Sequence, residues 1–383
     1  VQGNVAGSVQ IVGSLKNFYL QGNLLLKKAH FTVDYTNVEY EIDSANFEFN
    51  NKGIHIKKAI IKDFQHNIGY VEGVINHQNL KNFYYDINVN SENMMVLNTI
   101  KQPGDHFYGK AFAKSDFTII GNENDLNFNL KAESKQHTFI HILNVDEKEN
   151  GTLEFIRFKK SIVAQNKTSN NTRFKFSFNA DLVLNNLAKI EVILDDVSND
   201  IIECIGEGNI KLNISTFDPI SMRGLYKIES GKYNLNFQSL IKTSFELTPN
   251  QNNFIEWTDK PLEANINIDA RYKVDRINLN ELIGSSNFSQ NVKSYKGAIY
   301  VVAQLRDKMY KPTINFKLEF PIVSPTNLDN EFTQFLNRLE KDENEMLKQV
   351  SFLIIFQSFA PINSIAGNFN NTNYNYANLG YNT

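Results

Sequence analysis

The sequence predicts an all-β protein: one long, curled, antiparallel-rich sheet, open-barrel-like, with a short amphipathic helical segment near the C-terminus. Three observations support this fold class. Apolar and polar residues alternate with a period of two in roughly twenty short segments. Turns that contain Asn and Gly separate these segments at the ~8–15-residue spacing of antiparallel strands. Helical spacing of apolar residues is confined to one stretch, beyond residue 326.

The first half of the chain contains regular strand patterns. Phe31, Val33 and Tyr35 share one face of an expected strand. Residues 45–61 predict a hairpin, because Asn and Gly in the turn at 50–53 tolerate positive φ. The same alternation predicts further strands at 82–90, 125–133 and 173–182.

The second half continues the pattern. Ser230 and Gly231 join two extended runs within residues 225–237, and further strands are expected at 261–274 and 313–320. The alternation stays one-sided throughout. A long sheet with a single apolar face buries that face either by curling around itself or by acquiring a cover.

Residues 326–359 predict two helices, or one kinked helix, ending before Pro361. Thr326 and Asn327 are candidate N-caps, and the helical period breaks at 341–344. One interpretation is an amphipathic cap over the sheet; the other is a docking helix for a partner. The acidic polar face argues against anionic lipid. The candidate cap or partner residues are Phe332, Phe335, Leu339, Leu347, Val350 and Leu353.

Composition excludes several classes of protein. The hydrophobic share of 42% and charged share of 21% exclude a disordered chain. A net charge of -3 gives no basis for nucleic-acid binding. Cys204 is the single cysteine, so no internal disulfide forms. No apolar run reaches the ~20 residues of a membrane helix. The first residue, Val1, is not Met, which suggests a piece of a longer protein.

No catalytic or metal-binding pattern is present. His137 and His141 are expected on one strand about 13 Å apart, too far for a shared metal. Gly206-Glu207-Gly208 precedes a strand rather than a helix, so it lacks the helix N-terminus that holds phosphate. The sequence therefore predicts a non-enzymatic protein with no catalytic residues and no metal site.

Residues 222–274 carry a family pattern. Two Gly-x-Tyr-x-apolar runs are followed by apolar strand residues, Ile-x-Trp, an Asp-Pro turn and Ala-x-Tyr. These positions are Gly224, Tyr226, Ile228, Gly231, Tyr233, Leu235, Phe237, Phe245, Leu247, Ile255, Trp257, Asp259, Pro261, Ala270 and Tyr272. Downstream, the matching positions are Pro312, Phe316, Pro321, Gln349, Leu353 and Phe359. The pattern resembles the C-terminal domain of TamB, the translocation and assembly module family of the AsmA-like superfamily, in its Bacteroidetes-type form.

The resemblance covers 222–359 most clearly and extends to 1–221. The family usually continues with further C-terminal strands, whereas this chain ends at Thr383. The resemblance implies four segments. They are a β-groove segment (1–221), a TamB C-terminal β-groove segment (222–327), an amphipathic helix or helix pair (328–360) and an Asn-rich loop or incomplete terminal strand (361–383).

The resemblance also implies a function. Family members form a β-taco around an apolar groove in the periplasm of Gram-negative bacteria. An upstream helix, absent from this chain, anchors them in the inner membrane. Their C-terminal end reaches the outer membrane and engages a BamA/TamA-type barrel. We therefore expect transport of phospholipid between the membranes, with no cofactor other than bound phospholipid or detergent. The alternative is a scaffold or chaperone that assists outer-membrane protein insertion or secretion by β-augmentation.

Lipid would contact the apolar side of successive strands, at ~0.8 kcal/mol per buried CH₂. Core packing is the alternative for each residue, and a filled core would favour an adhesin-like sheet instead. The candidate groove-lining residues are Phe128, Leu130, Phe174, Phe176, Phe178, Leu235, Phe237, Phe245, Leu247, Ile266, Ile268, Tyr272, Ile314, Phe316 and Leu318.

Overall fold

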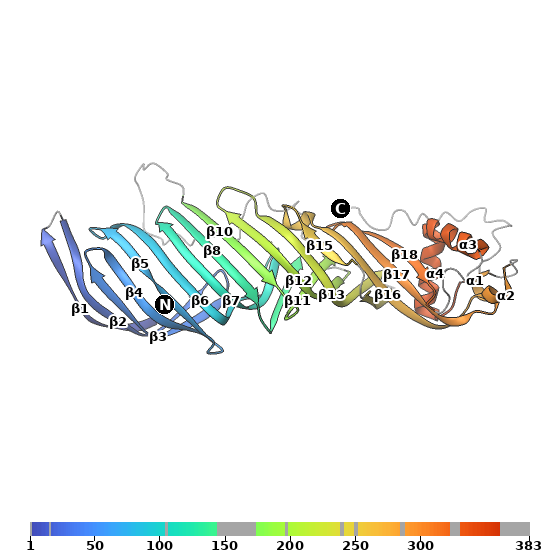
Figure 1. Ribbon diagram of the computed structural model, residues 1–383, viewed down its shortest axis with the longest axis horizontal. Helices are drawn as coiled ribbons and strands as arrows, with labels where there is room; N and C mark the ends of the chain where they lie inside the picture. The colour runs from blue at the N-terminus through green and yellow to red at the C-terminus, as the bar shows by residue number, and fades with distance from the viewer. Residues whose placement is uncertain are drawn as a thin grey trace. The chain divides into compact units, whose positions relative to one another are not determined.

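The computed structural model describes residues 2–14, 17–103, 106–143, 174–195, 198–237, 241–248, 252–283, 288–321 and 330–360. Within these ranges, 18 strands belong to one large, mostly antiparallel sheet, and short helices lie near the C-terminus. The predicted all-β fold class is confirmed. Figure 1 shows these elements along the chain and labels most of them.

The elements have the following bounds. The strands are β1 (Gln2–Ser14), β2 (Asn17–Val33), β3 (Val38–Asn50), β4 (Gly53–Asp63), β5 (Ile68–Gln78), β6 (Lys81–Thr99), β7 (Phe107–Asn122), β8 (Asp125–Ser134), β9 (Thr138–Leu143), β10 (Lys175–Leu184), β11 (Ala188–Asp195), β12 (Asp200–Ser215), β13 (Ser221–Phe237), β14 (Ile241–Leu247), β15 (Phe254–Trp257), β16 (Asn265–Asn278), β17 (Lys296–Lys308) and β18 (Thr313–Glu319). The helices are η2 (Pro261–Glu263, a 3₁₀ turn), α1 (Asn280–Ile283), α2 (Gln290–Lys293), α3 (Asn330–Lys341) and α4 (Glu343–Phe356).

The chain divides into two compact units. Unit 1 comprises Val1–Arg271 and Ala303–Asn315, and unit 2 comprises Tyr272–Val302 and Phe316–Thr383. The segment boundaries at 221 and 327 stay predictions. The expected Asn-rich tail, 361–383, lies outside the described residues.

In unit 1, strands β1 to β8 form an antiparallel meander in chain order. Two pairs of strands then behave as single long strands with a break. β8 and β9 both pair antiparallel with β7, and β10 and β11 both pair antiparallel with β12. β10 runs parallel to β8, and β11 runs parallel to β9. The two breaks, at 135–137 and 185–187, therefore lie next to each other.

Neighbouring strands are also irregular where they lie opposite these two breaks. β6 has an irregular register between Ser91 and Met94, where it pairs with Ala113 and Ser115 of β7. Ala113 in turn pairs with Ser134, the last residue of β8. β12 shifts its register between Ile205 and Gly206, opposite the break in β10–β11. β13 then pairs with β15 at Gly224–Lys227 and with β14 at Lys232–Phe237, so its partner strand changes between these two ranges. We call this set the interruption row; bulges and breaks of this kind bend strands.

Packing across the sheet shows that unit 1 is folded over. Phe117, Leu130 and Ala180 lie in one cross-strand register. Phe107 precedes Phe117 by ten residues, about 33 Å along an extended strand. Even so, Phe107 packs against the buried cluster that contains Ala180 and Leu212. A flat sheet would keep these side chains apart, so the two ends of the strands approach each other in unit 1.

Unit 2 contains the helices α1 to α4. Asp342 ends α3 and caps α4, its side chain accepting a hydrogen bond from the Glu345 backbone N–H. This cap explains the break in the helical pattern at 341–344 and selects two helices over one kinked helix. Phe332 is fully buried, with ring contacts to Phe288 and Phe320. The acidic first turn of α4 complements the helix dipole.

Candidate functional site

The apolar residues of unit 1 form continuous cross-strand rows on one side of the sheet. Each row follows the backbone register from β1 through β8 to β10. One row consists of Val9, Gly22, Phe49, Ile54, Ile75, Tyr85, Gly121, Leu126 and Phe176. The row beside it consists of Gly7, Leu24, Phe47, Ile56, Gly73, Ile87, Ile119, Phe128 and Phe178. We call these two rows together the apolar face.

Exposure changes along unit 1. Across β2 to β10, the large side chains of the apolar face are half-buried, and the β1 residues Val5 and Ile11, on the same side of the sheet, are 61% and 73% exposed. From β11 onward, many apolar positions are fully buried, as at Val192, Ile202 and Tyr226. The first part of unit 1 thus leaves apolar surface accessible, whereas the later part is a filled core.

Most of the predicted lining residues divide along the same boundary, and Tyr272 on β16 and Ile314 on β18 are the exceptions. Seven of them are half-buried: Phe128, Leu130, Phe174, Phe176, Phe178, Tyr272 and Ile314. Seven others are buried: Leu235, Phe245, Leu247, Ile266, Ile268, Phe316 and Leu318. The side chain of Phe237 lies outside the described residues. The structure brings Leu130, Phe176 and Phe178 together around the Ala180 cluster.

Sequence reasoning left several members of the apolar face out of the lining set. They are Leu24, Phe47, Phe49, Ile54, Ile56, Ile75, Tyr85, Ile87, Ile119 and Leu126. Their strands carry the same period-2 pattern, so the signal was present in the sequence. What was missing is the register that aligns one strand with the next.

The predicted cap or partner residues pack inside unit 2. Phe332, Leu339, Val350 and Leu353 are buried, and Phe335 and Leu347 are half-buried. Two neighbouring residues of α4 remain on the surface instead: Ile355 is 51% exposed and Phe356 is 62% exposed. Within the described residues, none of the helices combines the length and hydropathy needed to cross a bilayer.

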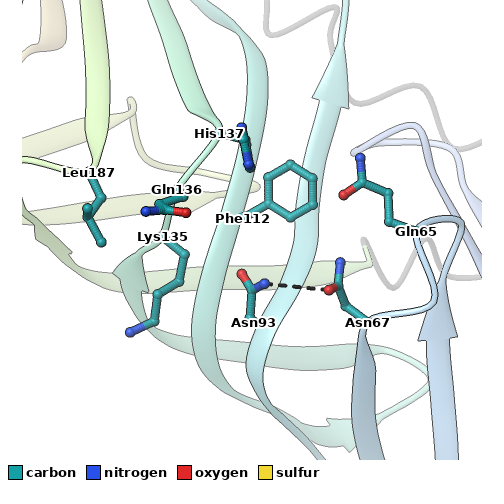
Figure 2. Close-up of a pocket in the computed structure, with 8 residues that line it drawn as sticks. All are labelled: Gln65, Asn67, Asn93, Phe112, Lys135, Gln136, His137 and Leu187. Carbon is teal, nitrogen blue, oxygen red and sulfur yellow. Dashed lines mark hydrogen bonds between the residues drawn. The ribbon is translucent and has the colours of Figure 1, made fainter.

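A separate polar pocket of about 420 Å³ lies at the interruption row (Figure 2). Its wall comes from the β4–β5 turn, β6, β7 and the breaks in β8–β9 and β10–β11. The lining residues are Gln65, Asn67, Asn93, Phe112, Lys135, Gln136, His137 and Leu187. The expectation that His137 and His141 share a strand is wrong: β9 begins at Thr138, and His137 sits in the left-handed region with φ 67°.

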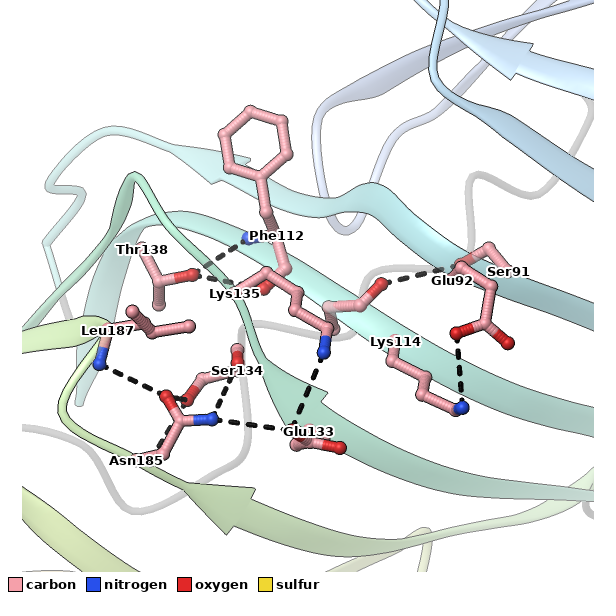
Figure 3. Close-up of polar contacts among 11 residues, drawn as sticks. Ser91, Glu92, Phe112, Lys114, Glu133, Ser134, Lys135, Thr138, Asn185 and Leu187 are labelled. Atoms are coloured by element: carbon pink, nitrogen blue, oxygen red, sulfur yellow. Dashed lines mark hydrogen bonds and ion pairs between the residues drawn. The ribbon is translucent and has the colours of Figure 1, made fainter.

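Polar side chains at the interruption row replace missing strand hydrogen bonds (Figure 3). Thr138 Oγ1 accepts from the Phe112 N–H and donates to the Phe112 carbonyl, both at 3.0 Å. The Asn185 backbone N–H donates to the Ser134 hydroxyl oxygen at 3.0 Å, and the Ser134 hydroxyl donates to Asn185 Oδ1 at 2.9 Å. These bonds connect the break in β10–β11 to the break in β8–β9. The backbone at the breaks is therefore held by specific hydrogen bonds.

Burial alters the acid–base chemistry of two groups near β12. It raises the pKa of the Cys204 thiol to about 12, so this cysteine stays protonated and unreactive at neutral pH. It also raises the pKa of Asp200 to about 6, although the nearby Tyr233 hydroxyl acts in the opposite direction. Among the described residues, no group of three or more His, Cys, Asp or Glu side chains is arranged to hold a metal ion.

Comparison with known proteins gives one match. The family model of the TamB C-terminal domain matches residues 57–377. No curated protein and no solved structure matches the chain at a significant level. The matched range covers ten of the eighteen positions of the apolar face, those on β5 to β8 and β10, and all of unit 2 in the described residues.

Proposed function

The chain belongs to the TamB C-terminal domain family, and from this premise we propose that it carries phospholipid acyl chains on its apolar face. The family is a non-enzymatic part of the translocation and assembly module of the bacterial envelope and acts with an outer-membrane partner. In this proposal the chain works in the periplasm, and an upstream segment anchors it in the inner membrane.

The observation that carries the proposal is the half-buried state of the apolar face. Large aliphatic and aromatic side chains follow one another across β2 to β8 and β10 and keep part of their surface accessible. An acyl chain of fourteen or so carbons gains about 10 kcal/mol when it is fully removed from water, and roughly half of that when one side is covered. A gain of this size retains a lipid while still permitting it to move along the face.

The filled core limits where lipid lies. Tyr226, Tyr233 and Phe245 are fully buried, so their positions offer no surface to an acyl chain. The proposed lipid contacts are therefore confined to β1–β10, and Phe128, Leu130, Phe176 and Phe178 are the strongest of the candidate residues.

Site-specific photocrosslinking tests this proposal. We expect a benzophenone amino acid at Phe128 to crosslink phospholipid in cells. The same group at Asn129, the next residue on the opposite and exposed face of β8, should not. Lipid adducts of equal yield at both positions, or at neither, would rule out transport on the apolar face.

Docking to a BamA/TamA-type barrel is the second part of the proposal, and the family's outer-membrane partner supports it. Ile355 and Phe356 on α4 provide an exposed apolar surface for this contact. We expect Phe356→Glu to abolish co-purification of the barrel while lipid crosslinking at Phe128 persists. Phe64→Glu is the matched control, because Phe64 is 51% exposed in the β4–β5 turn of unit 1. Barrel capture that survives Phe356→Glu would exclude this surface.

A further inference from the structure

We infer that the polar pocket at the interruption row binds a saccharide, through neutral hydroxyl groups. This inference concerns a site apart from the apolar face and does not depend on lipid transport. The pocket volume of about 420 Å³ falls within the ~300–1,000 Å³ typical of small-molecule sites. Figure 2 shows its side chains gathered from segments that are far apart in the sequence.

Primary amides dominate the hydrogen-bonding capacity of the pocket. Gln65, Asn67, Asn93 and Gln136 each present one carbonyl acceptor and two N–H donors. Asn93 and Asn67 bond each other at 3.5 Å, whereas the Gln65 and Gln136 side chains make no hydrogen bond to any described residue. A paired donor and acceptor on one planar group matches two adjacent hydroxyls, each of which both donates and accepts.

Charge argues against an anionic ligand. Lys135 is the one Lys or Arg among the eight lining residues, and its Nζ lies 3.4 Å from Glu133 Oε1. Behind Asn67, the Asp63 carboxylate accepts from the Asn67 side chain at 2.9 Å. A phosphate site would need clustered cations or several converging charged donors. Uncharged hydroxyls need neither, and the exposed Leu187 offers apolar contact for the C–H side of a sugar ring.

Hydrogen bonds within the chain fix the backbone around the pocket. Asp63 is 2% exposed and accepts from the backbone N–H groups of Gln65, Asn67 and Met95 at 2.9, 3.0 and 2.8 Å. These bonds hold the β4–β5 turn against β6. On the opposite wall, the Lys135 N–H donates to the Phe112 carbonyl at 2.9 Å.

Two residues at the pocket adopt a backbone conformation that favours glycine. His66 has φ 63° and His137 has φ 67°, in the two turns that supply Gln65 and Gln136. Such conformations are costly and persist where the surroundings enforce them, often at binding sites. Fixed walls reduce the entropy cost of binding, which matters for a ligand held mainly by neutral hydrogen bonds.

Ligand-observed NMR and calorimetry on the 383-residue chain test the inference. The probes are an N-acetylglucosamine tetramer, which represents cell-wall glycan, and maltotetraose, which represents plain hexose chains such as those of lipopolysaccharide. We expect at least one probe to bind. The double variant Gln65→Ala/Gln136→Ala should weaken that binding about tenfold or more, since it removes two amide partners. Which probe binds better identifies the source of the saccharide.

Two control variants sharpen the result. Gln10→Ala/Gln21→Ala removes two exposed, cross-strand paired glutamines of β1 and β2 and should leave the affinity unchanged. Lys135→Gln replaces the charged ammonium group with a neutral amide, so saccharide affinity should change by less than about threefold. Retained thermal unfolding temperature shows that each variant is folded.

Three outcomes would overturn the inference. The first is no signal from either tetrasaccharide at about 10 mM, a concentration at which even millimolar affinity is visible. The second is wild-type affinity in the Gln65→Ala/Gln136→Ala variant. The third is competition by inorganic phosphate together with loss of binding in Lys135→Gln, which would identify an anion site.

Discussion

Single polar side chains maintain the irregular parts of this sheet. Asp63 is the clearest case, because its carboxylate takes the place of a neighbouring strand for the backbone of the β4–β5 turn and β6. Composition gives no hint of this role, since the sequence contains many aspartates in turns. Its signal is local: Asp63 ends an alternating run, and Asn67 follows four residues later.

Removing the Asp63 carboxylate should destabilise unit 1. We expect Asp63→Ala to lower the free energy of unfolding by about 2–4 kcal/mol, since it leaves several buried N–H groups without an acceptor. Urea unfolding followed by circular dichroism measures the loss. Asp43→Asn is the control: Asp43 pairs with Lys62 at the surface, so its removal should leave the free energy of unfolding nearly unchanged. Equal losses in the two variants would contradict this role.

Asp200 should make stability depend on pH. Its pKa is about 6 in the folded chain and 3.8 in the reference state, so the folded chain binds more protons between these values. Stability therefore falls as pH rises from about 4 to about 6, by about 1–2 kcal/mol. We expect Asp200→Asn to remove this slope in urea unfolding at pH 4–7, whereas Asp181→Asn, an exposed aspartate of β10, keeps it. An unchanged slope in Asp200→Asn would exclude this cause.

At the scale of elements, the alternating pattern predicted individual strands well. The expected strands at 125–133 and 173–182 correspond to β8 and β10. Their parallel pairing was not predictable, because it joins segments separated by residues 144–173 and depends on register rather than on local pattern. The interruption row was missed for the same reason: each break looks like an ordinary turn until its neighbours are aligned.

The glycines of the family pattern acquire a physical explanation. Gly224 and Gly231 in β13 have φ of 146° and 156°, which side chains rarely adopt. A Cβ at Gly224 would also collide with the carbonyl oxygen of Asn209 on β12. These positions were recognisable in the sequence through resemblance, and the close approach of β12 and β13 accounts for them.

The buried side-chain amide of Gln349 should contribute strongly to the stability of unit 2. It donates to the Ala360 carbonyl at 3.2 Å and accepts from the Ala360 N–H at 2.9 Å, and both residues are fully buried. We expect Gln349→Leu to cost about 2–3 kcal/mol in thermal or urea unfolding, because it leaves two backbone groups unpaired. The exposed Gln334 of α3 supplies the control Gln334→Leu, which should be nearly neutral. A neutral Gln349→Leu would show that water replaces these bonds.

On the scale of the whole molecule, sequence reasoning predicted the all-β class, the helical segment and the family. It did not predict where apolar surface stays accessible. Phe176 and Ile268 occupy equivalent places in their alternating patterns, yet Phe176 is half-buried and Ile268 is fully buried. Burial depends on how far unit 1 folds over, which is a property of many strands together.

This difference gives opposite expectations for the same substitution. Phe176→Glu should leave the chain folded and abolish lipid crosslinking at Phe128, because it places a charge beside the proposed lipid path. Ile268→Glu should unfold the chain, since a buried unpaired carboxylate costs several kcal/mol. Circular dichroism and crosslinking yield measure the two effects. A folded Phe176→Glu variant with full lipid crosslinking would count against the proposed path.

The interruption row also has an evolutionary consequence. In a regular strand, an insertion of one residue sends every later side chain to the opposite side of the sheet. An insertion between Phe128 and Leu130 would do so for the rest of β8, whereas one at 135–137 falls in a break and leaves β9 in phase. Related proteins can therefore gain or lose residues at the breaks while the apolar face keeps its orientation. Length variation among relatives should concentrate at these breaks.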